Sequence, residues 1–103
     1  MTQAAHIIRF AARPDSAEKL VAVFGRALPH ILEDATTVSW SVGRSENEPT
    51  TFVLTHAFES EAARSAHFDG PAATLIMTEG RPLFASEPTI EDLSVIAGGT
   101  TDG

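Results

Sequence analysis

The sequence predicts an α+β fold in which a four-stranded antiparallel sheet carries helices on one face. Two segments, residues 38–44 and 51–58, alternate their side chains with the period of a strand. A third segment, residues 15–32, has apolar side chains at helical spacing. With their neighbours these segments give the order β-α-β-β-α-β, which is the split βαβ arrangement.

Length and composition set the scale of the molecule. The chain has 103 residues, of which 43% are hydrophobic, and this suits one domain. We expect that domain over residues 1–97 and a disordered tail over residues 98–103. No stretch is long and apolar enough to span a membrane, and the N-terminus lacks a secretory signal, so we expect a cytoplasmic location by default.

The first strand and helix are expected at residues 5–12 and 15–32. Asp15 and Glu18 fit a D-x-x-E variant of the capping box at the start of the helix. Pro29 lacks an N–H group and presses on the preceding turn, so we expect a bend before the helix ends. The predicted apolar face of this helix consists of Leu20, Val23, Phe24, Ala27, Leu28 and Ile31.

The next two strands, residues 38–44 and 51–58, should form a hairpin around the polar loop 45–50. Successive side chains of a strand point to opposite sides, so each strand has two faces. On one face of the first strand lie Val38, Trp40, Val42 and Arg44. On one face of the second lie Phe52, Leu54, His56 and Phe58. A titratable ring is therefore expected in an apolar row.

A second helical region follows the hairpin. Ser60 is placed to cap its start, residues 69–71 interrupt it, and it is expected to resume over residues 72–78. Residues 80–88 should form a crossing loop, and residues 89–96 the last strand. Helices on one face leave the other face of the sheet, which carries apolar side chains, in need of cover. A second copy of the chain is the expected cover.

Residues 51–68 resemble the antibiotic biosynthesis monooxygenase family, whose members often have a strand ending in Glu-x-Trp before a Ser-x-x-Ala helix with a histidine. His56 stands at the position of that Glu and Phe58 at that of the Trp. The helix pattern is matched by Ser60, Ala63 and His67. A looser resemblance covers nearly the whole chain. It implies a ferredoxin-like domain that pairs into a dimeric α+β barrel.

The charge and the residue types exclude several partners and cofactors. With 14 acidic and 7 basic residues the formal charge is −7, so we expect neither nucleic acid nor a membrane surface as a partner. The absence of cysteine excludes disulfides and thiolate metal sites. No glycine-rich loop follows a strand in the pattern that a flavin or nicotinamide cofactor needs, so we predict no cofactor.

A metal site is also not expected. The chain has no H-E-x-x-H and no His-x-His motif, and His56 and Glu59 differ by an odd number along the strand, which sends them to opposite faces. A site made from two histidines would need a distant acid. Haem-degrading relatives pair an asparagine near the first strand with a late histidine, whereas here the single asparagine, Asn47, lies in the hairpin loop and no histidine follows His67.

His56 and His67 are the candidate catalytic residues. Either ring could take a proton from a ligand. A buried histidine bonded to a neighbour is the competing interpretation for His56. His6 and His30 are expected to be surface or packing residues.

The candidate substrate-binding residues are mainly aromatic. Each ring could wall a pocket between sheet and helices or simply belong to the core. Arg44 could anchor a phenolate, or it could pair with Glu46 and Glu48 in solvent. The candidates are Trp40, Phe52, Phe58, Phe68 and Arg44.

The resemblance implies a cofactor-independent monooxygenase that oxidises a phenolic, hydroquinone or polyketide-like ring with O₂. The expected partners are thus a small aromatic molecule, O₂ and a second copy of the chain. Two alternatives use the same pocket. One is a non-catalytic protein that binds an aromatic metabolite, and the other is a cyclase or isomerase.

Overall fold

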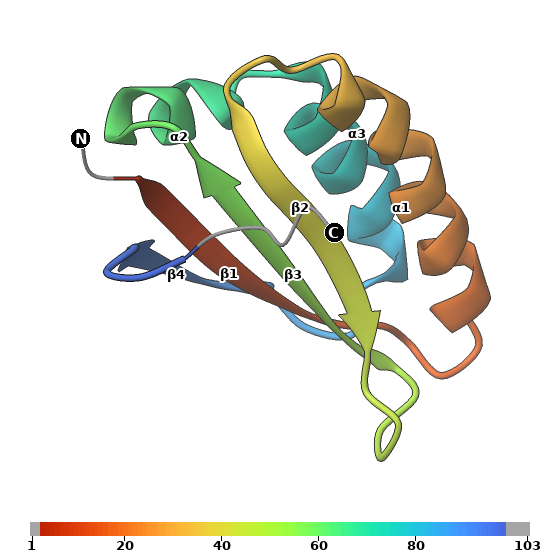
Figure 1. Ribbon diagram of the computed structural model, residues 1–103. Coiled ribbons are helices and arrows are strands. Elements are labelled where there is room, and N and C mark those ends of the chain that lie inside the picture. Colours follow the sequence, from red (N-terminus) through yellow and green to blue (C-terminus); the bar gives the residue numbers. More distant parts are fainter. Residues whose placement is uncertain (1–2, 99–103) are drawn as a thin grey trace, which may run out of the picture.

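Four antiparallel strands form one sheet, in the order β2-β3-β1-β4, in the computed structural model, which describes residues 3–98 (Figure 1). The two central strands are β1 (Ala4–Ala11) and β3 (Thr51–Phe58), and the edges are β2 (Thr37–Arg44) and β4 (Thr89–Ser94). The predicted α+β, ferredoxin-like βαββαβ fold is therefore confirmed. The last strand ends at Ser94, two residues earlier than predicted.

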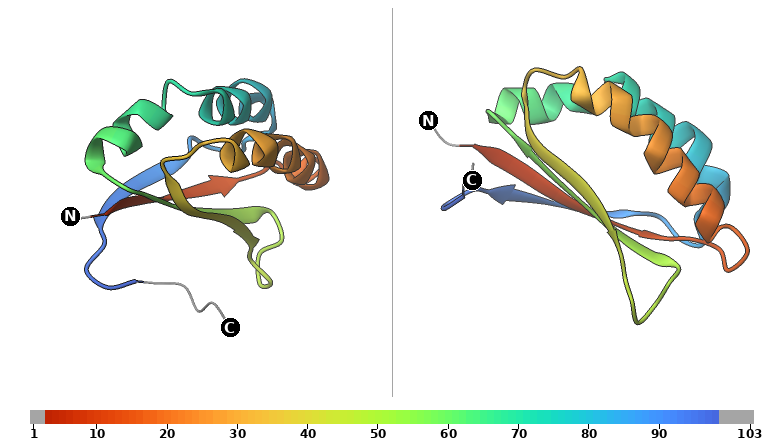
Figure 2. Two further views of the ribbon diagram at one scale, coloured as in Figure 1. Left: turned by 45° about the horizontal axis from the view of Figure 1, so that its top comes forward. Right: turned by 45° about the vertical axis from the view of Figure 1, so that its right-hand side comes forward.

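The helices all lie on one face of this sheet (Figure 2). They are α1 (Ala17–Leu32), α2 (Glu61–His67), α3 (Pro71–Gly80) and the short 3₁₀ helix η1 (Arg81–Leu83). The second helical region is interrupted before Pro71, as predicted. The expected crossing loop is shorter than predicted, because residues 80–83 are helical.

The start of α1 differs from the expected capping box. The N-cap residue is Ser16, and it makes no side-chain cap. Its hydroxyl instead donates to the Asp15 carboxylate at 3.2 Å, so that neither side chain caps the helix. Pro29 lies inside α1, which continues to Leu32.

The hydrophobic core lies between the helices and alternate residues of β1 and β3. Cross-strand register places Ile8 opposite Leu54 and Phe10 opposite Phe52, and all four side chains are buried. The helix side of the core is formed by Leu20, Val23, Phe24, Ala27, Ile31, Ala72, Ile76 and Phe84. The predicted apolar face of α1 is confirmed with one exception. Leu28 is 40% exposed and does not belong to the buried cluster.

The opposite face of the sheet is covered by no helix of the described residues (Figure 2). Its side chains alternate with those of the core along each strand. Ile7, Val53, Ala57 and Leu93 are half-buried there, and Thr55 is exposed. Arg9 and Glu91 lie on the same face, opposite Val53 and Ile7, so apolar and charged side chains are mixed there.

Residues 1–2 and 99–103 are not described, so most of the predicted tail over residues 98–103 lies outside the described part of the chain. Between residues 3 and 98 no helix has both the length and the apolar character needed to cross a bilayer.

Candidate functional site

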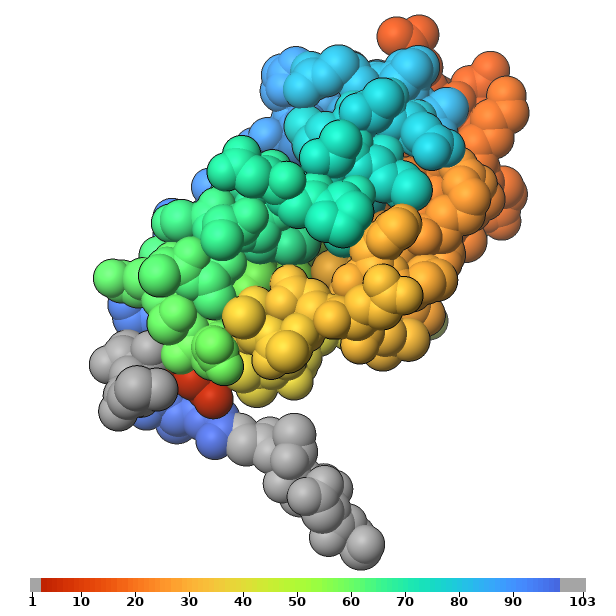
Figure 3. Space-filling model, turned by 90° about the horizontal axis from the view of Figure 1, so that it is seen from above, coloured from red at the N-terminus to blue at the C-terminus, as the bar shows by residue number. Residues whose placement is uncertain are grey.

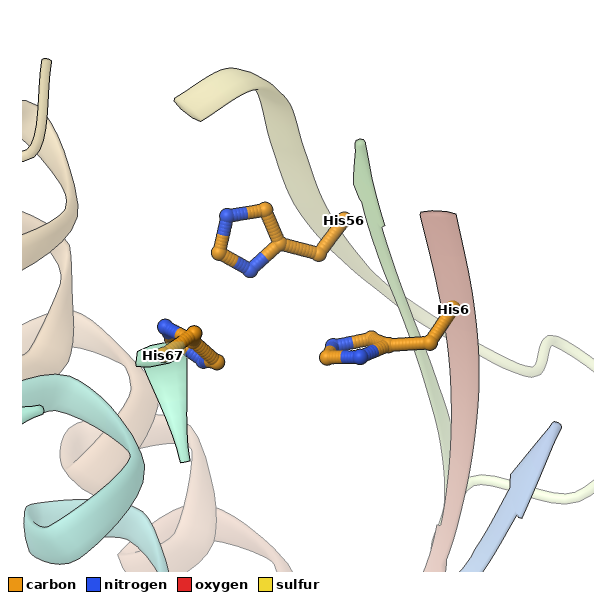
Figure 4. A group of neighbouring side chains, drawn as sticks. All are labelled: His6, His56 and His67. Carbon is orange, nitrogen blue, oxygen red and sulfur yellow. The ribbon is translucent and has the colours of Figure 1, made fainter. Parts of the chain in front are cut away.

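Three histidines from three different elements converge at one end of the sheet (Figure 4). His6 comes from β1, His56 from β3 and His67 from α2. One nitrogen of each ring lies within 4.8 Å of the corresponding nitrogens of the other two. We call these three residues the histidine cluster.

Strand pairing accounts for two members of the cluster. His6 is directly opposite His56 in the β1–β3 register, and directly paired residues project from the same face of a sheet. Both rings point toward the helices and are at most 1% exposed. Their centroids are 5.5 Å apart, with the ring planes at 89°.

The third member is positioned by the way α2 is fixed over the strands. The Ser60 hydroxyl accepts a hydrogen bond from the Ala63 N–H at 3.1 Å, which confirms Ser60 as the predicted cap. The Arg64 guanidinium donates to the carbonyl oxygens of Ala5 and Leu93, at 2.9 and 3.1 Å. These bonds hold α2 against β1 and β4. The His67 ring then lies 4.6 Å from that of His56, centroid to centroid.

Aromatic side chains surround the cluster. The Phe58 ring is stacked on His56 with a centroid distance of 3.8 Å. Phe68 lies 5.4 Å from His6 and is itself 44% exposed. The cluster is therefore in an apolar environment, where an unpaired charge is unfavourable.

Hydrogen bonding satisfies only part of the cluster. The His56 Nε2 is 2.9 Å from the Thr37 hydroxyl oxygen. The His56 Nδ1 and both ring nitrogens of His6 are buried and have no partner among the described residues. Buried polar atoms are rarely left without a partner, so three at one place need an explanation.

Burial also sets the protonation state of the cluster. Desolvation, reinforced by the neighbouring His67, lowers the pKa of His6 to about 4 and that of His56 to about 3. Desolvation lowers the pKa of His67 as well, against the opposing effect of the Asp34 carboxylate. All three rings are then neutral near pH 7, and each offers a lone pair.

His67 also lines a pocket. This pocket has a volume of ≈ 400 Å³ and lies between the end of α1, the following loop, α2 and the start of α3. Figure 3 shows this side of the molecule, where α2 in green lies beside the yellow chain that follows α1. The other lining residues are His30, Ile31, Glu33, Asp34, Thr36, Ala63, Ala66, Gly70, Pro71 and Ala72.

Asp34 places a negative charge in this pocket. Its carboxylate accepts hydrogen bonds from the hydroxyl and the backbone N–H of Thr36, at 2.6 and 2.9 Å. These bonds lower the pKa of Asp34 below its usual range. An ionised carboxylate near His67 stabilises a proton or another cation on that ring.

Arg44 and Phe52 do not belong to this site. They line a separate pocket of ≈ 300 Å³ with Val21, Phe24 and Val42. The Arg44 guanidinium lies 5.4 Å from the Phe52 ring centroid and pairs with Glu18 at 3.1 Å, rather than with Glu46 or Glu48. Four residues of strand, about 13 Å at roughly 3.3 Å per residue, separate Phe52 from His56.

Trp40 lies closer to the cluster. It is opposite His56 in the β2–β3 register and is half-buried. Its indole Nε1 is buried without a partner among the described residues. It lines a pocket of ≈ 220 Å³ that shares Ile31 and Asp34 with the larger pocket.

Sequence reasoning missed His6, which was expected to be a surface or packing residue. The ring is completely buried in the cluster. The sequence signal for its burial was the period of the strand, which places His6 on the same face as Ala4, Ile8 and Phe10. From the sequence, His56 and His67 were the two candidate metal ligands, and a site made from them would have needed a distant acid. The third candidate ligand is an imidazole from another strand and not a distant acid.

Comparison with known proteins agrees with this fold. The chain is similar to a solved protein of unknown function from Nitrosomonas europaea, with 31% identity, a TM-score of 0.89 and coverage of 100% of this chain and 98% of that one. A provisionally named antibiotic biosynthesis monooxygenase from Caulobacter crescentus has 16% identity, a TM-score of 0.85 and coverage of 93% and 92%. A Mycobacterium tuberculosis protein has 19% identity, a TM-score of 0.85 and coverage of 95% and 99%.

At 16% and 19% identity, the two less similar structures show a shared fold. No curated protein matches the sequence. The sequence pattern of the antibiotic biosynthesis monooxygenase family matches residues 4–78. These residues include the first three strands, α1, α2 and the whole histidine cluster. By this match over most of its length, the chain belongs to the antibiotic biosynthesis monooxygenase family.

Proposed function

We propose that this protein is an oxygenase that binds an electron-rich aromatic ring beside His67 and oxidises it with O₂. The observation that carries the proposal is the position of His67, which is a neutral imidazole in the wall of a largely apolar pocket. Phenols, hydroquinones and polyketide-like rings are the substrate class. They are flat and apolar, and each carries an acidic proton.

In this proposal the imidazole of His67 removes the phenolic proton. The resulting anion is electron-rich enough to reduce dioxygen directly, without flavin or metal. For an anthrone-type ring, a CH₂ group becomes C=O, one oxygen atom enters the product and the other leaves as water. A positioned general base contributes roughly 10²–10⁴-fold to rate.

Both His56 and Asp34 would support this base. The Asp34 carboxylate stabilises the imidazolium that forms when His67 takes the proton. The His56 ring lies behind His67 and does not line the pocket, so its role is to pack against the base and orient it. Among the predicted substrate-binding residues, Phe58 and Phe68 pack against the histidine cluster without lining this pocket, and Phe52 and Arg44 do not take part.

A second copy of the chain is the proposed cover for the free face of the sheet. Ile7, Val53, Ala57 and Leu93 are the apolar side chains of that face that a partner would cover. Pairing through it would leave the helices and the pocket on the outside of each protomer. The cytoplasmic location stays a prediction.

Oxygen consumption tests the proposed function. Purified protein freed of metal and flavin would be assayed with a panel of hydroquinones and anthrone-type phenols, corrected for autoxidation. Uptake that His67→Ala abolishes supports the oxygenase, and Ser65→Ala, an exposed change on the same helix, is the matched control. Product formation without uptake would indicate a cyclase or isomerase. Ligand binding with neither would indicate a binding protein.

A further inference from the structure

We propose that His6, His56 and His67 form a binding site for a divalent transition metal, with Zn²⁺ as the ion that fits best. Their ligand nitrogens lie within 4.8 Å of one another, on three elements that strand pairing and Arg64 hold in place (Figure 4). The inference goes beyond the proposed function, which uses the histidines without a metal.

The unpartnered nitrogens point to a ligand inside the cluster. His6 has two buried ring nitrogens without a partner among the described residues, and His56 has one. A neutral imidazole has one N–H donor and one lone pair, and burying either without a partner is unfavourable. A metal ion would use the lone pairs of all three rings at once, which accounts for one nitrogen of His6 and for the Nδ1 of His56.

The hydrogen bond of His56 suits the same arrangement. If its Nε2–H donates to the Thr37 hydroxyl, the lone pair is on Nδ1, which is the buried nitrogen without a partner. Histidines that bind metals usually donate their other N–H in this way, which fixes the tautomer and orients the ring. Thr37 is therefore the expected supporting residue.

The donor set selects the kind of metal. Three imidazoles without a carboxylate or a thiolate suit Zn²⁺, Co²⁺, Ni²⁺ or Cu²⁺ rather than Mg²⁺ or Ca²⁺. Three protein ligands also leave a fourth tetrahedral position for water or a substrate oxygen. Asp34 and the formal charge of −7 favour a cation here.

Binding requires a small closure of the cluster. Zn–N bonds of about 2.0–2.1 Å in a tetrahedral site place the nitrogens about 3.3 Å apart. The widest pair, within 4.8 Å, must therefore close by at most about 1.5 Å. Strand pairing and Arg64 fix the three backbones, so rotation of the three side chains must supply this movement. The adjacent pocket gives the ion a way in.

A bound metal would compete with the proposed base chemistry. The lone pair that coordinates the ion is the lone pair with which His67 would accept a proton. Zn²⁺ should therefore suppress oxygen uptake at the concentration at which it binds. Direct metal titration measures the site even if no substrate is ever turned over, so the two proposals can fail independently.

Calorimetric titration of chelator-treated protein with Zn²⁺ is the first experiment. We expect one ion per chain with a Kd below about 1 μM. His67→Ala should weaken binding by more than about 100-fold, and Thr37→Val by about 10–100-fold. His30→Ala removes the remaining histidine of the chain and should leave affinity unchanged.

Imidazole NMR of the unmutated protein avoids any variant that fails to fold. Stoichiometric Zn²⁺ should shift the ring signals of three of the four histidines and leave His30 unchanged, and Co²⁺ should give the visible bands of a tetrahedral site. Binding weaker than about 100 μM, or binding that His30→Ala removes and His67→Ala does not, would overturn the proposal. The cluster would then be a hydrogen-bonded or hydrated group without a metal.

Discussion

His6 and His56 face each other across β1 and β3, both almost fully buried, with ring centroids 5.5 Å apart. A histidine at such a position destabilises the fold relative to a leucine, because it buries polar ring nitrogens and a leucine buries none. In the row of paired residues on this face, Ala4 and Phe58 lie on one side of the histidines, and Ile8, Leu54, Phe10 and Phe52 continue on the other. One sheet face therefore serves as core at one end and as candidate site at the other.

The first prediction concerns the free energy of that arrangement. His6→Leu removes two buried, unpartnered nitrogens, so metal-free protein should gain about 1–3 kcal/mol in its free energy of unfolding. Urea denaturation after chelator treatment measures this. The same variant should lose high-affinity Zn²⁺ binding. A variant less stable than the parent would show that these nitrogens are satisfied in the native protein.

The pH dependence of stability is the second prediction. Because the pKa values of His6 and His56 are lowered to about 4 and about 3, the unfolded chain binds more protons than the folded chain below about pH 6.5. The stability of metal-free protein should therefore be fully present above that pH and fall as the medium is acidified. Each histidine contributes a slope of up to about 1.4 kcal/mol per pH unit.

Denaturation series at closely spaced pH values check the slope, and His6→Leu is the control. That variant should lose its share of the acid sensitivity between about pH 6.5 and 4. Equal slopes for parent and variant would show that the pKa of His6 is the same in the folded and the unfolded chain.

The third prediction addresses the free face of the sheet. Ala57→Glu places a charge beside Ala5 and Leu93 on that face, so it should convert a dimer into a monomer. Light scattering should give about twice the 10.9 kDa chain mass for the parent and the single mass for the variant. Thr74→Glu on the exposed side of α3 is the charge-matched control. A monomeric parent would rule out pairing through the sheet.

Local patterns were sufficient to predict the element order, the buried row on β3 and the Ser60 cap, because each depends on residues near in sequence. The histidine cluster was not predictable in full. It depends on which residue of β1 lies opposite His56, and on the Arg64 bonds to Ala5 and Leu93. Arg44 was misassigned for the same reason, since its partner Glu18 lies on another element.

The last prediction compares two glycines in helices. In Gly80→Ala the new Cβ would lie 2.9 Å from the ring of Phe84, which packs against Phe10 in the core. The ring must shift, and we expect a loss of about 1–3 kcal/mol in the free energy of unfolding. Gly25 in α1 has open space at its Cβ position. Gly25→Ala should therefore add about 0.5–1 kcal/mol through helix propensity.

Chemical denaturation of the two variants beside the parent measures this contrast, and each variant is the control for the other. The opposite signs follow from space alone, because the same methyl group is added to a helix in both cases. If Gly80→Ala were as stable as the parent, the contact between the end of α3 and Phe84 would be looser than described. The Phe84 ring, which packs against Phe10 in the core, would then have room to move.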